Sequence, residues 1–252
     1  MTAPPRLAGR VVVVTGGGRG IGRALAVSCA GQGARVAVVA RTLTQLEETV
    51  RSVKREGGEA IAVTADITDP SELTAMVDTV TSAFGRLDVL VNNAGIMRFG
   101  KLEDMTREDI AEVMNVNVVG TFMTTKAVIP TMRRQDGGKI INIASTFGLK
   151  PARGHAAYCA SKAAVIHFTR VAALELARDG IQVNAIAPGY VETDMTAEAL
   201  EDESIRERIN RRIPAQRVAQ PGELGPLVTF LASAESDYMT GETVAFDGGF
   251  HL

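Results

Sequence analysis

Tyr158 and Lys162 are the residues of this 252-residue chain whose spacing most directly suggests catalysis. They are four positions apart, so both side chains would lie on one face of a helix. A free tyrosine has a pKa of about 10 and is a poor acid or base at neutral pH, but a nearby ammonium group lowers that pKa. Such a tyrosine could protonate the alkoxide that develops when a ketone accepts a hydride. A Tyr and a Lys that merely share a helix surface are common by chance, and that interpretation would be favoured if the pair stood alone.

A glycine-rich turn from Thr15 to Gly22 follows the first apolar run of the chain. Between a strand and a helix of a parallel sheet, such a turn presents backbone N–H groups and a helix N-terminus to a phosphate. The common G-x-G-x-x-G spacing fits at no start position. The P-loop spacing runs from Gly17 to Gly22, but Arg23 and Ala24 stand where Lys and Ser or Thr are required, which argues against an NTPase. The turn indicates a dinucleotide site; a glycine-rich connection that binds nothing is the alternative.

The end of the second predicted strand indicates which dinucleotide would bind. An NAD enzyme needs a carboxylate there, about 20 residues past the glycine turn, to bond the ribose 2′-OH. The strand Arg35–Ala40 is followed by Arg41, and the first carboxylate is Glu47. With Arg19 inside the turn, two arginines could hold a 2′-phosphate by charge-assisted hydrogen bonds. We therefore predict NADP(H) over NAD(H); two solvated surface arginines are the alternative.

Other kinds of chemistry have less support in the sequence. Ser145 lacks the flanking glycines of a G-x-S-x-G elbow, which argues against a hydrolase. His155, His167 and His251 form no cluster of metal ligands, so no metal is predicted, although His155 precedes Tyr158 by three residues and could line a substrate pocket. A net charge of −2, 4% aromatic residues and no Trp give no reason to expect nucleic acid or an anionic membrane as a partner.

Short apolar runs alternate with helical stretches along the chain. The runs are rich in Val and Ile and are continuous, which is typical of strands covered on both faces of a parallel sheet. We expect strands at Val11–Thr15, Arg35–Ala40, Ala60–Thr64, Val89–Asn92, Lys139–Ala144, Gln182–Ala187 and Glu242–Phe246. We expect helices at Ile21–Ala30, Thr44–Glu56, Ser71–Phe84, Arg107–Arg134, Ala156–Arg178 and Pro221–Ser233. The pattern predicts a single-domain α/β fold of Rossmann type over residues 1–252, a doubly wound parallel sheet of about seven strands with helices on both faces.

The polar stretch Met195–Arg212 carries many charges and few strand signals. It could be a mobile helical lid over the substrate or a merely solvated surface helix. Residues 1–10 contain no apolar signal-peptide core, and no apolar run reaches membrane-spanning length, so we expect a cytoplasmic protein. Cys29 and Cys159 are expected to be reduced, partly buried thiols.

Taken together, the motifs resemble the short-chain dehydrogenase/reductase family over essentially the whole chain. In order they are Thr15-Gly16-x-x-x-Gly20-x-Gly22, Asn92-Asn93-Ala94-Gly95, Asn117-Val118-Val119-Gly120, Ser145, Tyr158-x-x-x-Lys162, Pro188-Gly189, Thr193, Thr240-Gly241 and Asp247-Gly248-Gly249. The resemblance implies that Ser145 holds the substrate carbonyl and that Tyr158 is the acid/base. It also implies that Lys162 bonds the nicotinamide ribose and that Asn117 supports Lys162 through a bound water.

The same resemblance implies a cofactor site for NADP(H) that draws on every motif. Asp66, after the third strand, is expected to meet the adenine and to play no part in the choice of cofactor. The implied cofactor-binding residues are Gly16, Gly18, Arg19, Gly20, Ile21, Gly22, Arg41, Asp66, Ile67, Asn93, Ala94, Gly95, Tyr158, Lys162, Pro188, Gly189, Val191 and Thr193.

Within the family, the chain is most similar to β-ketoacyl-carrier-protein reductases, through residues 191–196 and 239–243. Sugar and alcohol dehydrogenases share much of the pattern, so a ketone and a secondary alcohol are expected without a single compound being named. The reductases hold an acidic carrier protein with basic residues. This chain has Asp136 and Asp179 at the two aligned positions, which argues against carrier-protein binding, although basic residues that could substitute lie nearby at Arg133, Arg134 and Arg178.

A cofactor-binding protein without catalysis is the alternative on the same fold, because a fold does not fix a function. The intact set of four catalytic positions favours an enzyme. The long segments Arg107–Arg134 and Ala156–Arg178 carry many small apolar residues. Family members commonly pair two such helices across a twofold axis, so we expect a homotetramer, with a dimer as the second possibility.

Overall fold

A single parallel sheet organises the computed structural model, which describes residues 5–252 apart from the side chains of residues 198 and 199. Its seven strands lie in the order β3-β2-β1-β4-β5-β6-β7, and every neighbouring pair is parallel. Their bounds are β1 Val11–Thr15, β2 Arg35–Ala40, β3 Glu59–Thr64, β4 Val89–Asn92, β5 Gly138–Ile143, β6 Ile181–Pro188 and β7 Thr243–Phe246. The strand order reverses between β1 and β4, and the crevice at such a reversal is where open parallel sheets bind ligands.

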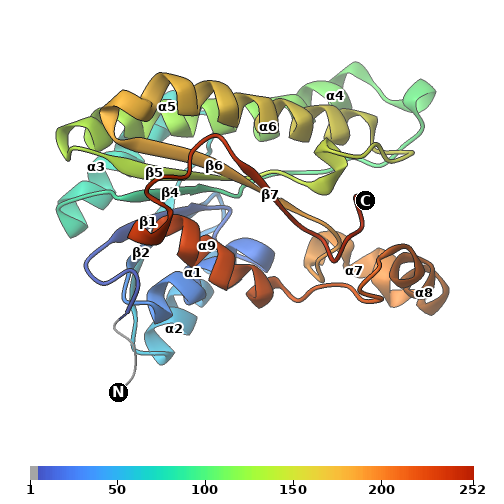
Figure 1. Ribbon diagram of the computed structural model, residues 1–252, viewed down its shortest axis with the longest axis horizontal. Coiled ribbons are helices and arrows are strands. Elements are labelled where there is room, and N and C mark those ends of the chain that lie inside the picture. The colour runs from blue at the N-terminus through green and yellow to red at the C-terminus, as the bar shows by residue number, and fades with distance from the viewer. Residues whose placement is uncertain (1–4) are drawn as a thin grey trace.

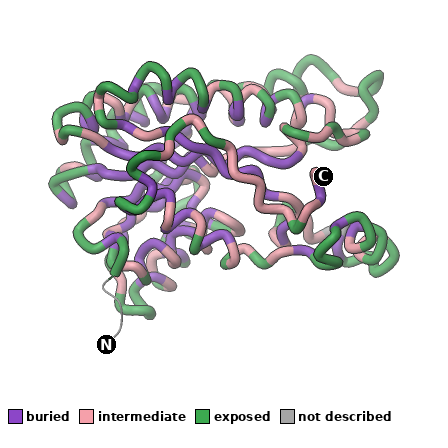
Figure 2. The backbone as a smooth tube through the Cα atoms, viewed as in Figure 1, coloured by how far each residue is buried: buried purple, intermediate pink, exposed green. Residues whose placement is uncertain are grey.

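Helices cover both faces of this sheet (Figure 1). Alternate residues of a strand point to opposite faces, so Val12 and Val14 pack with one set of helices and Val11 and Val13 with the other. The first set is α1 Gly20–Gly31, α2 Leu43–Arg55 and α9 Gly225–Ala232. The second is α3 Pro70–Phe84, α5 Gly120–Arg134 and α6 Ala156–Leu176. Figure 2 shows the buried residues concentrated along the strands and on the helix faces that contact them. The predicted doubly wound Rossmann-type fold is confirmed.

The prediction of one continuous helix over residues 107–134 is wrong, because the helix is interrupted. Helix α4 spans Arg107–Met114, a π-helical turn follows at Asn115–Val119, and α5 begins at Gly120. The wider turn lies where the Asn117 side chain points inward and bonds the segment after β4. Single π-helical turns of this kind occur often at functional sites.

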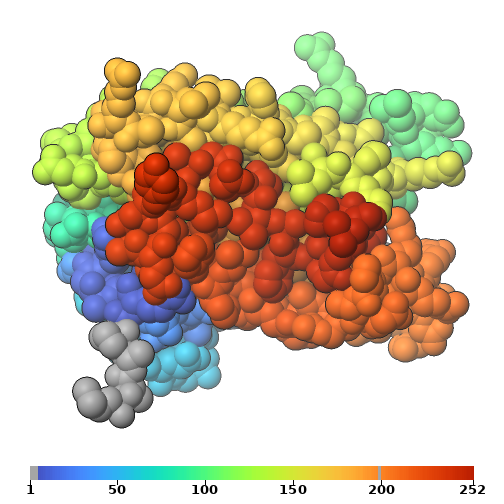
Figure 3. Space-filling model, in the orientation of Figure 1, coloured from blue at the N-terminus to red at the C-terminus, as the bar shows by residue number. Residues whose placement is uncertain are grey.

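The polar stretch near residues 195–212 forms two helices rather than one. They are α7 Asp194–Glu201 and α8 Glu203–Arg212, and Asp202 caps α8 by accepting hydrogen bonds from the N–H groups of Ser204 and Ile205. The two helices have a small core of their own, formed by Leu200, Ile209, Ile213, Val218 and Phe250. Figures 1 and 3 show them projecting at one end of the molecule beside the C-terminal residues. Helices α7 and α8 therefore pack on buried apolar residues and are not merely solvated surface helices.

Smaller differences lie at the ends of elements. Helix α6 ends at Leu176, because residues 177–179 form a 3₁₀ turn closed by Gly180, whose φ is +69°. Helix α9 begins at Gly225, four residues later than predicted, after a 3₁₀ turn at Pro221–Leu224. Cys29 is buried, Cys159 is half-buried, and both are free thiols, as predicted. Among the described residues, no helix is both long and apolar enough to cross a membrane.

Candidate active site

The glycine turn between β1 and α1 has a shape that side chains would prevent. Gly16 and Gly20 have φ angles of +63° and +51°, which favour glycine. A Cβ on Gly16 would lie 2.9 Å from the Cα of Ala94, and a Cβ on Gly22 would overlap the carbonyl oxygen of Gly16. These positions let the start of α1 approach the segment after β4 without an intervening side chain.

Hydrogen bonds tie the turn to that neighbouring segment. The Thr15 hydroxyl accepts from the N–H groups of Asn93 and Ala94 at 3.0 and 3.1 Å. The Asn93 side-chain amide donates back to the Thr15 carbonyl at 2.9 Å. The predicted cofactor residues Asn93 and Ala94 are thus fixed against the turn, across the crevice between β1 and β4.

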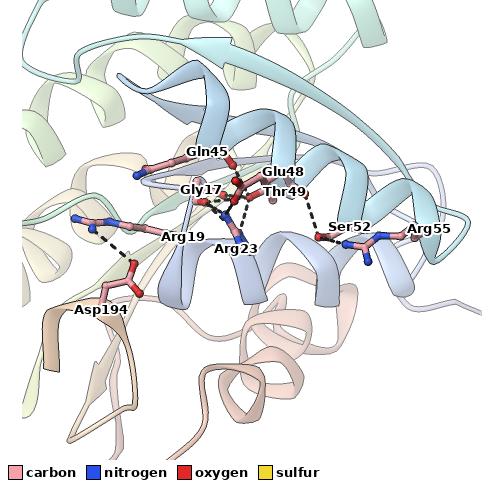
Figure 4. A network of polar contacts seen from close by, with 10 residues as sticks. Gly17, Arg19, Arg23, Gln45, Glu48, Thr49, Ser52, Arg55 and Asp194 are labelled. Carbon is pink, nitrogen blue, oxygen red and sulfur yellow. Dashed lines mark hydrogen bonds and ion pairs between the residues drawn. The ribbon is translucent and has the colours of Figure 1, made fainter. Parts of the chain in front are cut away.

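A second set of bonds holds the carbonyl groups of the turn on its far side (Figure 4). Thr49, which is fully buried on α2, donates to the Gly17 carbonyl at 2.9 Å. Arg23 donates to the Gly18 carbonyl at 2.6 Å and to the Glu48 carboxylate at 2.7 Å. Sequence reasoning misses both side chains, because Arg23 stands out in the sequence only as a departure from the P-loop pattern and Thr49 carries no local signal.

The amide groups of the turn are left available as donors. The N–H groups of Gly18, Arg19, Gly20 and Ile21 bond no acceptor in the part of the chain that the structure describes. Four successive donors at a helix N-terminus form a site for an anion. The turn therefore fits the pyrophosphate of a dinucleotide.

Ser145, Tyr158 and Lys162 meet at the same carboxyl edge of the sheet. Ser145 follows β5, is 8% exposed and accepts a hydrogen bond from the Phe147 N–H at 3.1 Å. Tyr158 and Lys162 lie on one face of α6, and the Lys162 ammonium is 5.8 Å from the centre of the Tyr158 ring. Tyr158 and Lys162 therefore share one face of a helix, as their spacing predicts, and Tyr158 lies within hydrogen-bond reach of Ser145.

The pKa of Tyr158 does not move in the expected direction. Burial raises the pKa of Tyr158 to about 12, and a hydrogen bond with the Ser145 side chain offsets only part of that rise. The Lys162 ammonium donates to the Ile143 carbonyl at 2.8 Å, and burial lowers the pKa of Lys162 to about 8. The predicted lowering of the tyrosine pKa is therefore wrong for this structure, because loss of solvation outweighs the hydrogen bond with Ser145.

Asn117 joins three segments of the site. Its side-chain oxygen accepts from the Ile96 N–H at 2.8 Å, and its amide donates to the Ile96 carbonyl at 2.9 Å and to the Ser161 hydroxyl at 3.0 Å. A Cβ on Gly95 would lie 3.2 Å from that oxygen and 3.5 Å from the Lys162 ammonium, so Gly95 leaves room for both groups. Asn117 thus holds the segment after β4 against α6, which carries Lys162.

The two arginines predicted to bind a 2′-phosphate are exposed and lie beside carboxylates. Arg41 is 3.8 Å from Asp66, and Arg19 is 3.6 Å from Asp194 at the start of α7. Both pairs are largely solvent-exposed, where ion pairs are weak. Asp66 thus lies beside one of the two arginines, and the expectation that it meets the adenine and plays no part in the choice of cofactor stays a prediction.

The remaining predicted cofactor residues lie around the same crevice. Pro188 ends β6, Val191 bridges to Ala219, and Thr193 faces the glycine turn, where a Cβ on Gly20 would be 3.5 Å from the Thr193 side chain. Ile67, after β3, is buried and lies close to Gly120 of α5. The sequence motifs from both halves of the chain therefore converge on one region.

Comparison with known proteins decides the family. A family model described as enoyl-(acyl carrier protein) reductase matches residues 16–251. The chain belongs to the short-chain dehydrogenase/reductase family. It is 42% identical to a 3-oxoacyl-(acyl-carrier-protein) reductase, FabG, from Staphylococcus aureus, covering 95% of this chain and 97% of that one. It is 43% identical to the corresponding reductase of Synechocystis sp., covering 96% and 97%.

Solved structures of the same family are closely similar. A gluconate 5-dehydrogenase from Burkholderia cenocepacia, in complex with NADP and tartrate, superposes with a TM-score of 0.93 at 36% identity, covering 98% of this chain and 97% of that one. Levodione reductase gives a TM-score of 0.93 at 33% identity, covering 98% and 99%. The predicted resemblance is confirmed, and this short-chain dehydrogenase/reductase is an oxidoreductase.

Proposed function

We propose that this enzyme interconverts a ketone and a secondary alcohol with NADP(H), using Tyr158 as acid/base. The observation that carries the proposal is the convergence of Ser145, Tyr158 and Lys162 beside a glycine turn with open amide donors. A protein that only bound a dinucleotide would not need this convergence.

Ser145, Tyr158 and Lys162 each have a separate role in carbonyl reduction. Bound NADPH supplies the hydride. Ser145 donates a hydrogen bond to the substrate carbonyl and so stabilises the negative charge that develops on its oxygen. Tyr158, whose pKa is raised to about 12, keeps its proton at neutral pH and gives it to that oxygen. Lys162, a cation below about pH 8, stabilises the phenolate that remains.

The cofactor would be held along the crevice between β1 and β4. Arg41 and Arg19 would bind the 2′-phosphate, whose charge competes with Asp66 and Asp194 for the two guanidinium groups. Asn117 acts as a positioning residue, because it bonds the segment that carries Asn93–Gly95. The further proposed contacts are Gly16, Gly18, Gly20, Ile21, Gly22, Ile67, Asn93, Ala94, Gly95, Pro188, Gly189, Val191 and Thr193.

A 3-oxoacyl thioester is a candidate substrate, because the relatives named above include 3-oxoacyl reductases. Delivery on an acidic carrier protein has less support. Arg133, one of the cations that could receive such a partner, pairs with Asp179 at 2.8 Å. Asp136 lines the same surface hollow, together with Arg178. We therefore propose a substrate that is not bound to a carrier.

The helices on one face of the sheet offer a surface for self-association. Phe122 of α5 stacks on Phe168 of α6 at 3.7 Å between ring centres and remains 44% exposed. Val171 and Leu174 of α6 are also exposed, Leu174 by 82%. These residues support the predicted pairing of helices in a homotetramer, with a dimer as the second possibility. The cytoplasmic location and the single catalytic domain over residues 1–252 stay predictions.

The test is ketone-dependent oxidation of NADPH. We expect the purified enzyme to consume NADPH only when a ketone is present, across a panel of aryl ketones, 3-oxoacyl thioesters and sugars. Tight NADPH binding with no turnover of any ketone, and no NADP⁺ reduction by the matching alcohols, would instead identify a cofactor-binding protein without catalysis.

A further inference from the structure

Nearly half of the chain's Phe and Tyr residues, Tyr158 among them, belong to one cluster of rings. The chain has 8 Phe, 3 Tyr and no Trp, and five of these eleven rings join His155 in one continuous set of ring contacts. The centres of the contacting rings are 5.0–6.4 Å apart. We call this set the aromatic cluster; it consists of Phe99, Phe147, His155, Tyr158, Tyr190 and Phe250.

The fold explains why residues so far apart in sequence meet. Phe99 follows β4, Phe147 follows β5, Tyr190 follows β6 and Phe250 follows β7. The carboxyl ends of parallel strands lie at one edge of the sheet, so the segments after them are neighbours. The aromatic cluster is therefore built at the same edge as Ser145 and Tyr158.

Phe147 is the centre of the aromatic cluster. Its ring meets Tyr158 at 6.4 Å and Tyr190 at 5.8 Å, both nearly edge-on, and His155 at 5.0 Å. Behind it, Phe250 is 3% exposed, and the Lys150 ammonium binds the Phe250 carbonyl at 2.9 Å. The half-buried Phe147 ring, packed on Phe250, thus presents an apolar surface beside the Tyr158 ring.

Phe99 joins the aromatic cluster through His155, and it is held there although it is 77% exposed. The Gly100 N–H donates to the Gly154 carbonyl at 3.0 Å, and a Cβ on Gly154 would overlap the Phe99 ring. The Phe99 ring lies edge-on to His155 at 5.1 Å.

The His155 ring is itself fixed. Its Nδ1 is 2.9 Å from the Arg153 carbonyl, and since a carbonyl only accepts, Nδ1 carries the proton. An exposed ring gains little from the hydrophobic effect. A ligand that covered the Phe99 ring would bury this apolar surface.

We propose that the aromatic cluster binds the apolar ring of an aryl or alicyclic ketone, with the carbonyl placed at Ser145 and Tyr158. This inference rests on the proposed function, and it names the substrate class of the same site. Aromatic rings offer edge and face contacts to another ring. A polyhydroxylated chain against them would bury hydroxyl groups without hydrogen-bond partners.

The experiment compares two kinds of ketone at saturating NADPH. Acetophenone and cyclohexyl methyl ketone represent the proposed class, and fructose represents the polyhydroxylated one. We expect kcat/KM for the ring ketones to exceed that for fructose by at least tenfold, and Phe99→Ala to lower this ratio at least fivefold, mainly through KM. Tyr238→Ala is the matched control, because Tyr238 is a fully exposed ring that precedes β7, at the opposite edge of the sheet.

A second readout separates this inference from the proposed function. Saturation-transfer NMR reports contact between the acetophenone ring protons and the enzyme without turnover. Ring contact that is lost in Phe99→Ala and kept in Tyr238→Ala supports the inference even if no ketone is reduced. Turnover of fructose that equals or exceeds that of the ring ketones, with a ratio unchanged in Phe99→Ala, overturns it and leaves the carbonyl reductase assignment intact.

Discussion

The cofactor crevice and the aromatic cluster are built from different parts of the chain. The crevice uses backbone groups: open amide donors on one side of the glycine turn, and carbonyl groups held by Thr49 and Arg23 on the other. The aromatic cluster uses side chains alone, backed by the small core under α7 and α8. Because the cofactor crevice depends little on side-chain identity, many sequences can build it and bind the same ligand. The ligand preference of the aromatic cluster, in contrast, can change with single substitutions.

Tyr158 lies between the two regions, and its loss should have the largest effect. Tyr158→Phe removes the proton donor but keeps the ring that contacts Phe147. We expect kcat for ketone reduction to fall by about 10²–10⁴-fold, the usual contribution of a positioned acid. NADPH affinity, measured by fluorescence titration, should change little. A variant that keeps near-normal kcat would show that the proton comes from another group.

Two substitutions at the end of β2 should change the choice of cofactor. The double variant Ala40→Asp/Arg41→Ala places a carboxylate where an NAD enzyme needs one and removes a guanidinium that would bind the 2′-phosphate. We expect the parent to prefer NADPH by about tenfold or more per effective arginine contact, since 1.4 kcal/mol is a factor of ten. The variant should lose or reverse that preference.

The measurement is KM for NADPH and NADH with one ketone, and the KM for the ketone serves as the internal control. A parent that prefers NADH would show that the arginines do not bind the phosphate. A change in ketone KM of the same size would show that the two regions are not separate.

The pH dependence should come from Lys162. Burial lowers its pKa to about 8, so its charge is present below about pH 8 and is lost as the pH rises through that value. Since Tyr158 keeps its proton to about pH 12, we expect kcat for reduction to be level below pH 8 and to fall about tenfold per pH unit above it.

Folding stability should rise, rather than fall, as the pH increases above 8. Between pH 8 and the ordinary lysine pKa of 10.5, the unfolded chain binds a proton at Lys162 that the folded chain does not, so Lys162 contributes stability that rises with pH. A fall in kcat between pH 8 and 9 without a fall in Tm would therefore separate catalysis from unfolding. A reduction rate that stays level to pH 9 would contradict the role given to the lysine charge.

The two regions also differ in how much the sequence could predict. The glycine turn, the strand ends and the Tyr158–Lys162 pair follow local rules of spacing, and the structure places them as expected. Of the aromatic cluster, the sequence suggests only that His155 could line a substrate pocket, because the rings come from five segments that only the fold brings together.

Two further differences have physical causes of the same kind. The π-helical turn contains Asn117, which bonds Ile96, twenty-one residues earlier, and no helix propensity reports such a bond. The raised pKa of Tyr158 arises from burial, whereas residue spacing could reveal only the charge of Lys162.

Arg23 offers the smallest and most local test of the comparison. It bonds the Gly18 carbonyl and the Glu48 carboxylate, so it holds the glycine turn against α2 without facing the open amide donors. Hydrogen bonds to charged groups contribute about 1.5–3 kcal/mol each, and a partly exposed guanidinium is expected at the low end of that range. Arg23→Ala should therefore raise KM for NADPH about tenfold and leave kcat at saturating cofactor within about twofold.

The matched variant Arg23→Lys keeps the charge but has no planar guanidinium group, and it should recover only part of the affinity for NADPH. The KM for the ketone is the decisive control. If it rises in Arg23→Ala as much as the KM for NADPH, the contacts of Arg23 affect the whole site, and the cofactor crevice and the aromatic cluster are not independent.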